Sequence, residues 1–143
     1  MAYFDSNVFI YAVIYSKAVP QATEARVILE CTEKGLVKAY TSTLTWDELV
    51  WVVRKTLGRR DAEDKGRMLL QFPNLKFINV GESTILQAQK LVERYGLKPR
   101  DAIHAAAALD KNLTMVSDDT DFDVVKGLKR ISIKEFSTKL QRG

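Results

Sequence analysis

Short segments that favour β-strands alternate with longer segments that favour helices along the whole sequence. The runs LTMVS and LVKAYTS are typical of strands, whereas PQATEARVILECTEK and ESTILQAQKLVERY carry apolar residues at helical spacing. The expected strands are 2–4, 36–42, 75–80, 113–117 and 128–133. The expected helices are 8–15, 20–34, 43–57, 60–72, 82–95, 99–111 and 134–140. This alternation predicts an α/β fold, a three-layer α/β/α sandwich with a mostly parallel central sheet.

Prolines and glycines mark the ends of several expected helices. Pro20 and Pro99 are placed to open helices, because proline suits the first helical position, where no backbone N–H is needed. Gly58 and Gly96 follow apolar helical patterns and are expected to end them. Asn7 is a plausible N-cap for the helix 8–15.

Length and composition limit the class of protein. The 143 residues suit a single domain, 1–143, and 46% hydrophobic with 28% charged residues is an ordinary globular balance. No apolar run approaches the length of a membrane span, and the start of the chain lacks the basic and apolar pattern of a secretory signal, which favours a cytoplasmic protein. One cysteine, Cys31, excludes an internal disulfide and a thiolate metal cage. The net charge of +4 permits nucleic-acid binding without requiring it.

Acidic residues follow two of the expected strands. Asp5 comes directly after 2–4, and Ser117, Asp119 and Asp121 follow the run LTMV. In open α/β sheets, ligands bind beyond the carboxyl ends of the strands. The sequence therefore predicts that two acidic groups, far apart along the chain, lie at the same edge of the sheet.

The segment SDDTDFD is either a solvated turn or part of a site that needs carboxylates. If it is extended, Asp119 and Asp121 point to one side. Phe122 is expected to anchor the segment in the core, and a solvated role is preferred for Asp118 and Asp123.

Further acids and the only histidine each have an ordinary structural explanation. Thr45 and Glu48 form the pattern of a capping box, and Asp101 lies near the third position of an expected helix, where an acid stabilises the helix dipole. His104 follows Asp101 by three residues in an alanine-rich helix. A lone histidine there is more typical of a packed, hydrogen-bonded side chain than of a catalyst, so it is left out of the catalytic set.

If these acids converge, a cation is expected among them. Two carboxylates about 4 Å apart repel by roughly 4 kcal/mol at an effective dielectric constant of about 20. Oxygen ligands without a histidine or cysteine cluster suit a hard ion, Mg²⁺ or Mn²⁺.

Four motifs in order resemble those of the PIN-domain nucleases, and specifically the VapC-like toxins of prokaryotic toxin–antitoxin pairs. The motifs are YFDSNVFIYA, TSTLTWDELVWVV, LKPRDAIHAAAAL and MVSDDTDFD. The resemblance covers nearly the whole chain. It implies metal-dependent hydrolysis of RNA, a homodimer, and an antitoxin protein that blocks the metal site.

The resemblance also implies roles for individual residues. The acidic metal site would be formed by Asp5, Glu48, Asp101 and Asp119, with Asp121 as a further ligand or supporting acid. Supporting roles in the site would fall to Ser6, Asn7 and Ser117. An extra acid, Asp118, stands where the family has a variable residue.

Basic and aromatic side chains suggest further surfaces. Lys98 and Arg100 flank Asp101, and Arg54 and Arg59 belong to the densest basic segment, so these four are candidate contacts for RNA phosphates. The helix 43–57 is apolar on more than one face, which fits either full burial or a homodimer interface.

Other functions remain as alternatives. A receiver-like phosphoacceptor domain also gathers Mg²⁺-binding acids at strand ends, but the strand 75–80, expected to be central, ends without an aspartate. A haloacid-dehalogenase phosphatase would want Asp-x-Asp after the first strand, where this chain has Asp5, Ser6 and Asn7. A non-catalytic RNA-binding module with a PIN fold is the third alternative.

Overall fold

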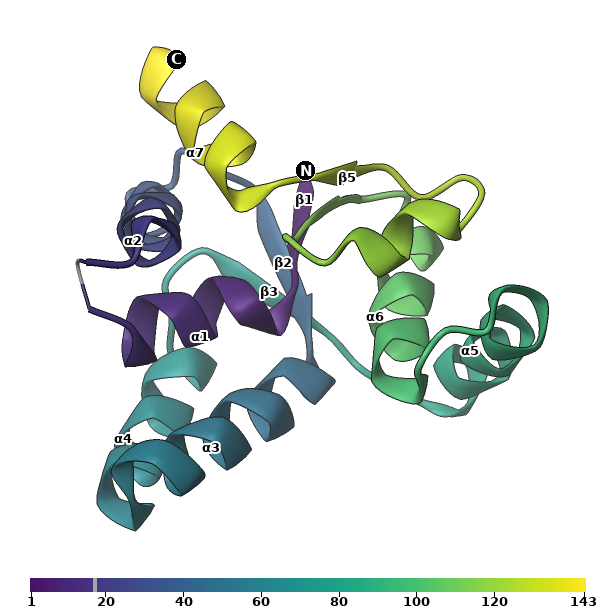
Figure 1. The fold of residues 1–143 in the computed structure, drawn as a ribbon, viewed down its shortest axis with the longest axis horizontal. Coiled ribbons are helices and arrows are strands. Elements are labelled where there is room, and N and C mark those ends of the chain that lie inside the picture. Colours follow the sequence, from purple (N-terminus) through teal and green to yellow (C-terminus); the bar gives the residue numbers. More distant parts are fainter. Residues whose placement is uncertain (17) are drawn as a thin grey trace.

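A five-stranded parallel sheet forms the centre of the fold (Figure 1). The computed structural model describes residues 1–16 and 18–143. The strands of the described residues are β1 (Ala2–Phe4), β2 (Ala39–Ser42), β3 (Leu75–Ile78), β4 (Thr114–Val116) and β5 (Arg130–Ile131). Their order across the sheet is β3-β2-β1-β4-β5, and every neighbouring pair is parallel. The predicted parallel sheet is confirmed.

Helices cover both faces of this sheet. The helices are α1 (Ser6–Ile14), α2 (Pro20–Glu33), α3 (Thr43–Leu57), α4 (Arg59–Leu70), α5 (Glu82–Tyr95), α6 (Pro99–Asp110), α7 (Ile133–Arg142) and the 3₁₀ helix η1 (Thr120–Val124). In Figure 1, α5 and α6 lie together on one side of the strands, and the other α-helices lie on the opposite side. The three-layer arrangement predicted from the sequence is therefore present.

The strands contribute alternate side chains to two separate hydrophobic cores. Ala2 and Phe4 of β1 belong to the core under α1, α2, α3 and α7, whereas Tyr3 belongs to the core under α5 and α6. Val116 and Met115 of β4 divide in the same way. Because successive side chains of a strand point to opposite faces, short apolar strands suit a sheet that is covered on both sides.

The alanines of α6 allow this helix to lie close against the sheet. The fully or almost fully buried residues are Ala102, Ala105, Ala106, Ala107 and Ala108. Small side chains shorten the distance between a helix and its neighbours, and this close approach brings the first turn of α6 to the carboxyl edge of the strands.

The helix ends follow the expected prolines and glycines, with two corrections. Pro20 and Pro99 occupy the first turns of α2 and α6, and Gly96 ends α5 in the left-handed conformation, with φ of 69°. The predicted N-cap at Asn7 is wrong, because Asp5 caps α1. The predicted capping box at Thr45 and Glu48 is also wrong, because α3 already begins at Thr43 and Thr45 hydrogen-bonds Thr41 instead.

The sheet order corrects one further expectation. The strand expected to be central, β3, lies at the edge, and β1 is the central strand. The central strand does end in an aspartate, Asp5, so the argument raised from β3 against a receiver-like domain does not hold.

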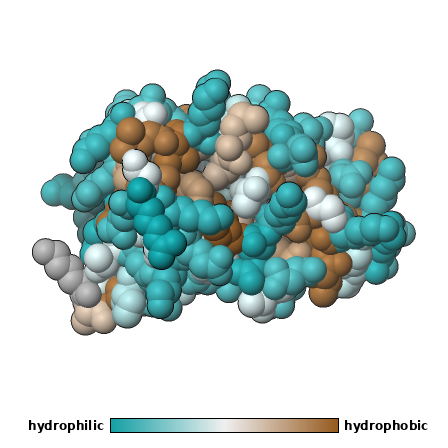
Figure 2. All heavy atoms as spheres, turned by 90° about the horizontal axis from the view of Figure 1, so that it is seen from above, coloured by the Kyte–Doolittle hydropathy of each residue, from teal (hydrophilic) through white to brown (hydrophobic). Residues whose placement is uncertain are grey.

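The outer surface is mainly hydrophilic where the strands begin. Figure 2 views this end of the molecule from above and shows hydrophilic side chains with hydrophobic areas between them. Within residues 1–16 and 18–143, no helix combines the length and the hydropathy needed to cross a membrane.

Candidate metal centre

The candidate site lies where the chain reverses its direction of travel across the sheet. From β1 the chain adds β2 and β3 on one side, and it then returns to add β4 and β5 on the other. A crevice forms at such a point, between the carboxyl ends of neighbouring strands, and it is the usual ligand site of open α/β sheets. Asp5 follows β1, and Ser117 follows its neighbour β4.

Asp5 is buried and held by hydrogen bonds on both oxygens. Its Oδ1 accepts from the backbone N–H of Ser6 at 2.7 Å, and its Oδ2 accepts from the hydroxyl of Ser117 at 2.7 Å. Burial raises the pKa of Asp5, because a carboxylate loses hydration there, while His104 and the Ser117 hydroxyl oppose that rise. A carboxylate that has lost its hydration in this way needs a positively charged partner to remain ionised.

Ser117 connects the two acidic segments that the sequence predicted to meet. Its O–H donates to Asp5, and its oxygen accepts from the backbone N–H of Asp119 at 3.0 Å. Asp119 in turn caps η1, where its Oδ1 accepts from the N–H of Asp121 at 2.9 Å. One chain of hydrogen bonds therefore runs from the end of β1 to the acidic segment.

Three carboxylates gather at the first turn of α6. One oxygen each from Asp101, Asp119 and Asp121 lies within 4.8 Å of the other two. The pKa of Asp101 rises to about 6, because burial and then the negative charges of Asp119 and Asp5 disfavour its ionised form. Asp5 belongs to a second group of possible ligands, with Glu48 and His104, and its charge contributes to the raised pKa of Asp101.

Glu48, on α3, lies on the other side of His104 from Asp5. Oε1 of Glu48 is hydrogen-bonded to Nε2 of His104, and that nitrogen lies 3.6 Å from Oδ1 of Asp5. The prediction that His104 is a packed, hydrogen-bonded side chain is confirmed, but its partners are themselves candidate site residues. Its place three residues after Asp101 in α6 was the one sequence signal for a role in the site.

The acidic segment is not extended, which corrects one expectation. Thr120–Val124 forms η1, because Asp119 caps it and Phe122 is fully buried beneath it. Asp118 accepts a hydrogen bond from the N–H of Ile133, and Asp123 forms a two-pronged ion pair with Arg130. The solvated role preferred for these two acids is therefore replaced by specific partners, a backbone N–H for Asp118 and a guanidinium for Asp123.

The remaining predicted residues lie around this centre. Ser6 and Asn7 occupy the first turn of α1, where Ser6 is buried and Asn7 is half-buried. Lys98 and Arg100 are exposed at the start of α6, beside Asp101. Their contact with RNA phosphates stays a prediction.

The other two basic candidates lie on a separate surface. Arg54 and Arg59 line a groove of about 380 Å³ between α3 and α4, together with Trp46, and Arg59 forms an ion pair with Glu63. The full burial considered for α3 is wrong for the single chain, since Trp46 is 40% exposed and Trp51 is 53% exposed.

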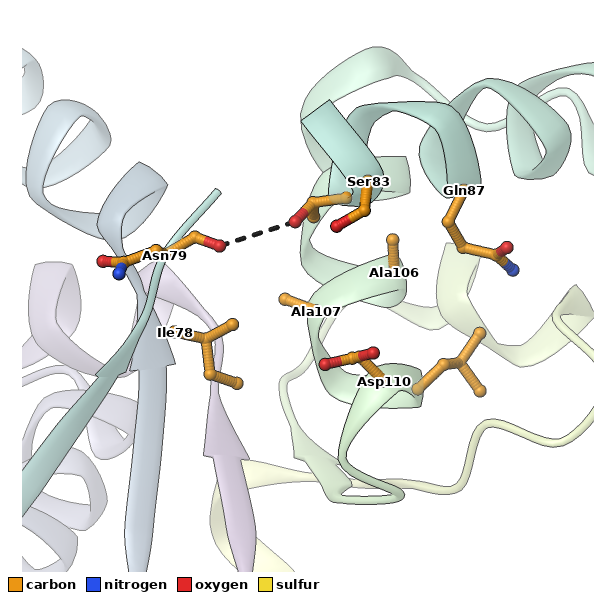
Figure 3. A pocket seen from close by; sticks show the side chains of 9 residues that line it. Ile78, Asn79, Ser83, Gln87, Ala106, Ala107 and Asp110 are labelled. Atoms are coloured by element: carbon orange, nitrogen blue, oxygen red, sulfur yellow. Dashed lines mark hydrogen bonds between the residues drawn. The ribbon is translucent and has the colours of Figure 1, made fainter. Parts of the chain in front are cut away.

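A different pocket lies beside the sheet, between β3, α5 and α6 (Figure 3). Its volume is about 380 Å³, and the hydrogen bond drawn there joins the Thr84 hydroxyl to the carbonyl oxygen of Asn79. The side chains labelled in Figure 3 are uncharged except Asp110. None of the residues that line this pocket is a predicted site residue, so the acids form a separate feature.

The donor set of the acidic centre fits a hard divalent cation. It offers carboxylate oxygens, which Mg²⁺ and Mn²⁺ prefer. Among the ion pairs of the described residues, none neutralises Asp101, Asp119 or Asp121. Three acids so close together, with no ion pair to them within residues 1–16 and 18–143, are the arrangement that a metal ion would stabilise.

Fold and acids together define the class of protein: an α/β sandwich with a carboxylate centre at the carboxyl edge of a parallel sheet. Comparison with protein families shows a match to the PIN domain over residues 2–128. The chain therefore belongs to the PIN-domain family. A comparison with curated protein sequences found no match.

Solved structures share this fold over most of their length. VapBC2 from Rickettsia felis, bound to a DNA fragment from its promoter, is 21% identical, with a TM-score of 0.70 over 92% of this chain and 98% of that one. A toxin–antitoxin complex from Klebsiella pneumoniae is 25% identical, with a TM-score of 0.67 over 93% and 98%. VapC20 from Mycobacterium tuberculosis, a sarcin–ricin loop cleaving toxin, is 15% identical, with a TM-score of 0.72 over 87% and 94%.

Proposed function

We propose that this protein is a Mg²⁺- or Mn²⁺-dependent endoribonuclease that hydrolyses RNA phosphodiester bonds. The observation that carries the proposal is the gathering of Asp101, Asp119 and Asp121 at the first turn of α6, with the charge of Asp5 contributing to the raised pKa of Asp101. Membership of the PIN-domain family supports it, because the matched residues 2–128 include all of these acids. A second candidate, a non-catalytic RNA-binding module, differs in needing neither the metal nor the buried carboxylate.

In the proposed reaction, a metal ion and the carboxylates would have separate roles. A bound divalent ion would supply the positive charge that activates a water molecule and stabilises the leaving oxygen. The residues that could hold a metal form two groups, Asp5 with Glu48 and His104, and Asp101 with Asp119 and Asp121. We assign the ion to the carboxylates of both groups, namely Asp5, Glu48, Asp101 and Asp119, with Asp121 beside them. Asp101 would be a candidate to accept a proton from water, because its pKa of about 6 lies close to neutral pH.

The test is the cleavage of a labelled structured RNA in Mg²⁺, in Mn²⁺ and in EDTA. We expect cleavage with either metal, none in EDTA, and a loss of at least about 100-fold in Asp5→Asn, because a ligand is removed from the centre. Asp47→Asn is the matched control, since Asp47 is exposed on α3 next to Glu48. Full activity of Asp5→Asn would contradict the proposal, and RNA binding without cleavage in every metal would favour the non-catalytic module.

We infer further that the protein is the toxin of a toxin–antitoxin pair, acting in the cytoplasm and inhibited by an antitoxin protein. The names of the similar structures support this inference, since they are toxin–antitoxin complexes or a toxin. The exposed Trp51 on α3 supports a protein–protein interface, either of a homodimer or with the antitoxin. Growth arrest on expression of the wild-type chain, absent for Asp5→Asn, would be the expected result in a bacterial host.

A further inference from the structure

His104 is the only histidine of the chain, and it is buried beside the acidic centre. Its side chain is 1% exposed. Nδ1 of the ring lies 2.6 Å from the hydroxyl of Tyr3 on β1, and Nε2 is hydrogen-bonded to Glu48 on α3. Three elements of the fold therefore meet at one imidazole.

The hydrogen bonds determine which ring nitrogen carries a proton toward Glu48. An ionised carboxylate can only accept a hydrogen bond, so the bond between His104 and Glu48 places a proton on Nε2. The hydroxyl of Tyr3 donates to Oγ of Ser42 at 2.8 Å, which leaves its oxygen free to accept from Nδ1. The chain Ser42–Tyr3–His104–Glu48 thus runs from the end of β2 to the acidic centre.

Glu48 has fewer hydrogen-bond partners than Asp5, the other acid that lies next to His104. Asp5 is held by Ser6 and Ser117, and Asp119 accepts a bond from the backbone of its own turn. In contrast, the bond with His104 is the one hydrogen bond of the Glu48 carboxylate among the described residues. Glutamate also has more rotatable bonds than aspartate, so fixing it costs more side-chain entropy.

We propose that His104 is a positioning residue, which holds the Glu48 carboxylate beside Asp5 through its Nε2–H, while Tyr3 and Ser42 hold the imidazole ring. This role rests on the proposed function, since Glu48 is assigned there to the metal ion. Partners that orient metal ligands commonly change metal affinity by roughly 10–100-fold when removed. The effect of His104 should therefore appear in metal affinity as well as in cleavage.

Two substitutions of the same chemical type separate positioning from packing. The amide nitrogen of glutamine reaches the place of Nε2, so His104→Gln retains the donor to Glu48. The amide of asparagine reaches only the place of Nδ1, so His104→Asn retains the contact to Tyr3 and loses the one to Glu48. Both variants are smaller than histidine, and both leave a polar group in α6.

The first measurement is the affinity of purified variants for Mn²⁺ alone, by calorimetry. We expect His104→Gln to bind within about threefold of wild type and His104→Asn to bind roughly 10–100-fold more weakly, as Glu48→Gln does. Equal binding by both variants and wild type would overturn the positioning role. Equal losses in both variants, in proportion to lost thermal stability, would assign His104 to packing and overturn it too.

The second measurement requires neither metal nor RNA. Because the chain has one histidine, its imidazole nitrogens give a single set of NMR signals in ¹⁵N-labelled protein. We expect a protonated Nε2 whose signal shifts in Glu48→Gln, whereas Tyr3→Phe changes mainly Nδ1. An unprotonated Nε2 would overturn the inference alone, and a wild-type protein that binds no Mn²⁺ would overturn the proposed function with it.

Discussion

The hydroxyl of Ser117 donates a 2.7 Å hydrogen bond to Oδ2 of Asp5, although the two residues lie 112 positions apart. The same oxygen accepts from the backbone of Asp119, so a single buried side chain joins the ends of β1 and β4 to the acidic segment. Its position follows from the parallel pairing of β1 with β4, in which Phe4 and Val116 are opposite each other. The geometry of the centre therefore depends on a residue that would not itself hold the metal.

Replacement of Ser117 by alanine should destabilise the fold and weaken metal binding. The variant leaves the buried carboxylate of Asp5 with one donor fewer, which costs about 1–3 kcal/mol and raises its pKa further. Chemical denaturation in EDTA measures the first effect, and Mn²⁺ calorimetry measures the second. Ser6→Ala is the control, because the Ser6 hydroxyl is 3.5 Å from Asp5 and contributes little; equal losses in the two variants would contradict the role of Ser117.

Asp101→Asn should stabilise the metal-free protein at neutral pH but not in acid. The folded pKa of about 6 is above the ordinary value of 3.8, so the stability contributed by protonated Asp101 is present below pH 3.8 and is lost as pH rises through about 6. Because Asp101 is half-exposed, screening reduces the effect to about 1 kcal/mol. Thermal denaturation in EDTA near pH 4 and near pH 7.5 tests this.

At pH 7.5, addition of Mg²⁺ should make wild type more stable than Asp101→Asn, the reverse of the order expected in EDTA. The ion stabilises the form that binds it, by about 1.4 kcal/mol for each factor of ten in concentration above the dissociation constant. Wild type should therefore gain thermal stability with Mg²⁺ at pH 7.5, and Asp101→Asn should gain little. A variant that is less stable than wild type in EDTA at both pH values would contradict the assignment of Asp101 to a repulsive cluster.

Much of this arrangement follows from local sequence patterns, and the rest depends on contacts between distant segments. Asp5 and Asp119 could be assigned to one edge because parallel strands place their carboxyl ends together. The role of His104 could not be predicted, because its partner Glu48 lies 56 positions away and a lone histidine in an alanine-rich helix is more typical of packing. The order of the strands likewise depends on pairing that no single segment specifies.

The acidic segment shows how tertiary contacts override a local pattern. Alternation of acids favoured an extended segment, yet Asp119 caps a short 3₁₀ helix there. The burial of Phe122 and the ion pair of Asp123 with Arg130 stabilise the chain in this turn. A helical turn still brings Asp119 and Asp121 to Asp101, so the predicted grouping occurs for a different geometric reason.

Gly66→Ala should destabilise the contact between α3 and α4. A Cβ at Gly66 would lie 2.9 Å from Cγ2 of Val50 and 3.0 Å from Nε1 of Trp46. Alanine normally favours a helix by about 1 kcal/mol, but overpacking costs about 1–3 kcal/mol, so we expect a net loss of roughly 1 kcal/mol. Chemical denaturation measures the loss, and a smaller cost of Gly66→Ala in a Val50→Ala background would confirm its cause. A more stable single variant would contradict the steric argument.

Lys98 and Arg100 provide the most direct test of where RNA binds. Both are exposed at the start of α6, on either side of the proline that opens the helix and next to Asp101. If each contacts a phosphate, alanine in place of either should weaken RNA binding and reduce the slope of log affinity against log salt by about one. Binding is best measured with the Asp5→Asn protein, so that cleavage does not interfere.

Lys111 offers a matched control, because it is exposed at the opposite end of the same helix. Lys111→Ala should leave both the affinity and the salt slope unchanged. Arg54→Ala and Arg59→Ala report in the same assay on the groove between α3 and α4, which lies apart from the acids. If alanine at Arg54 or Arg59 lowers the salt slope, and alanine at Lys98 or Arg100 does not, the RNA binds along that groove. The start of α6 would then not belong to the binding surface.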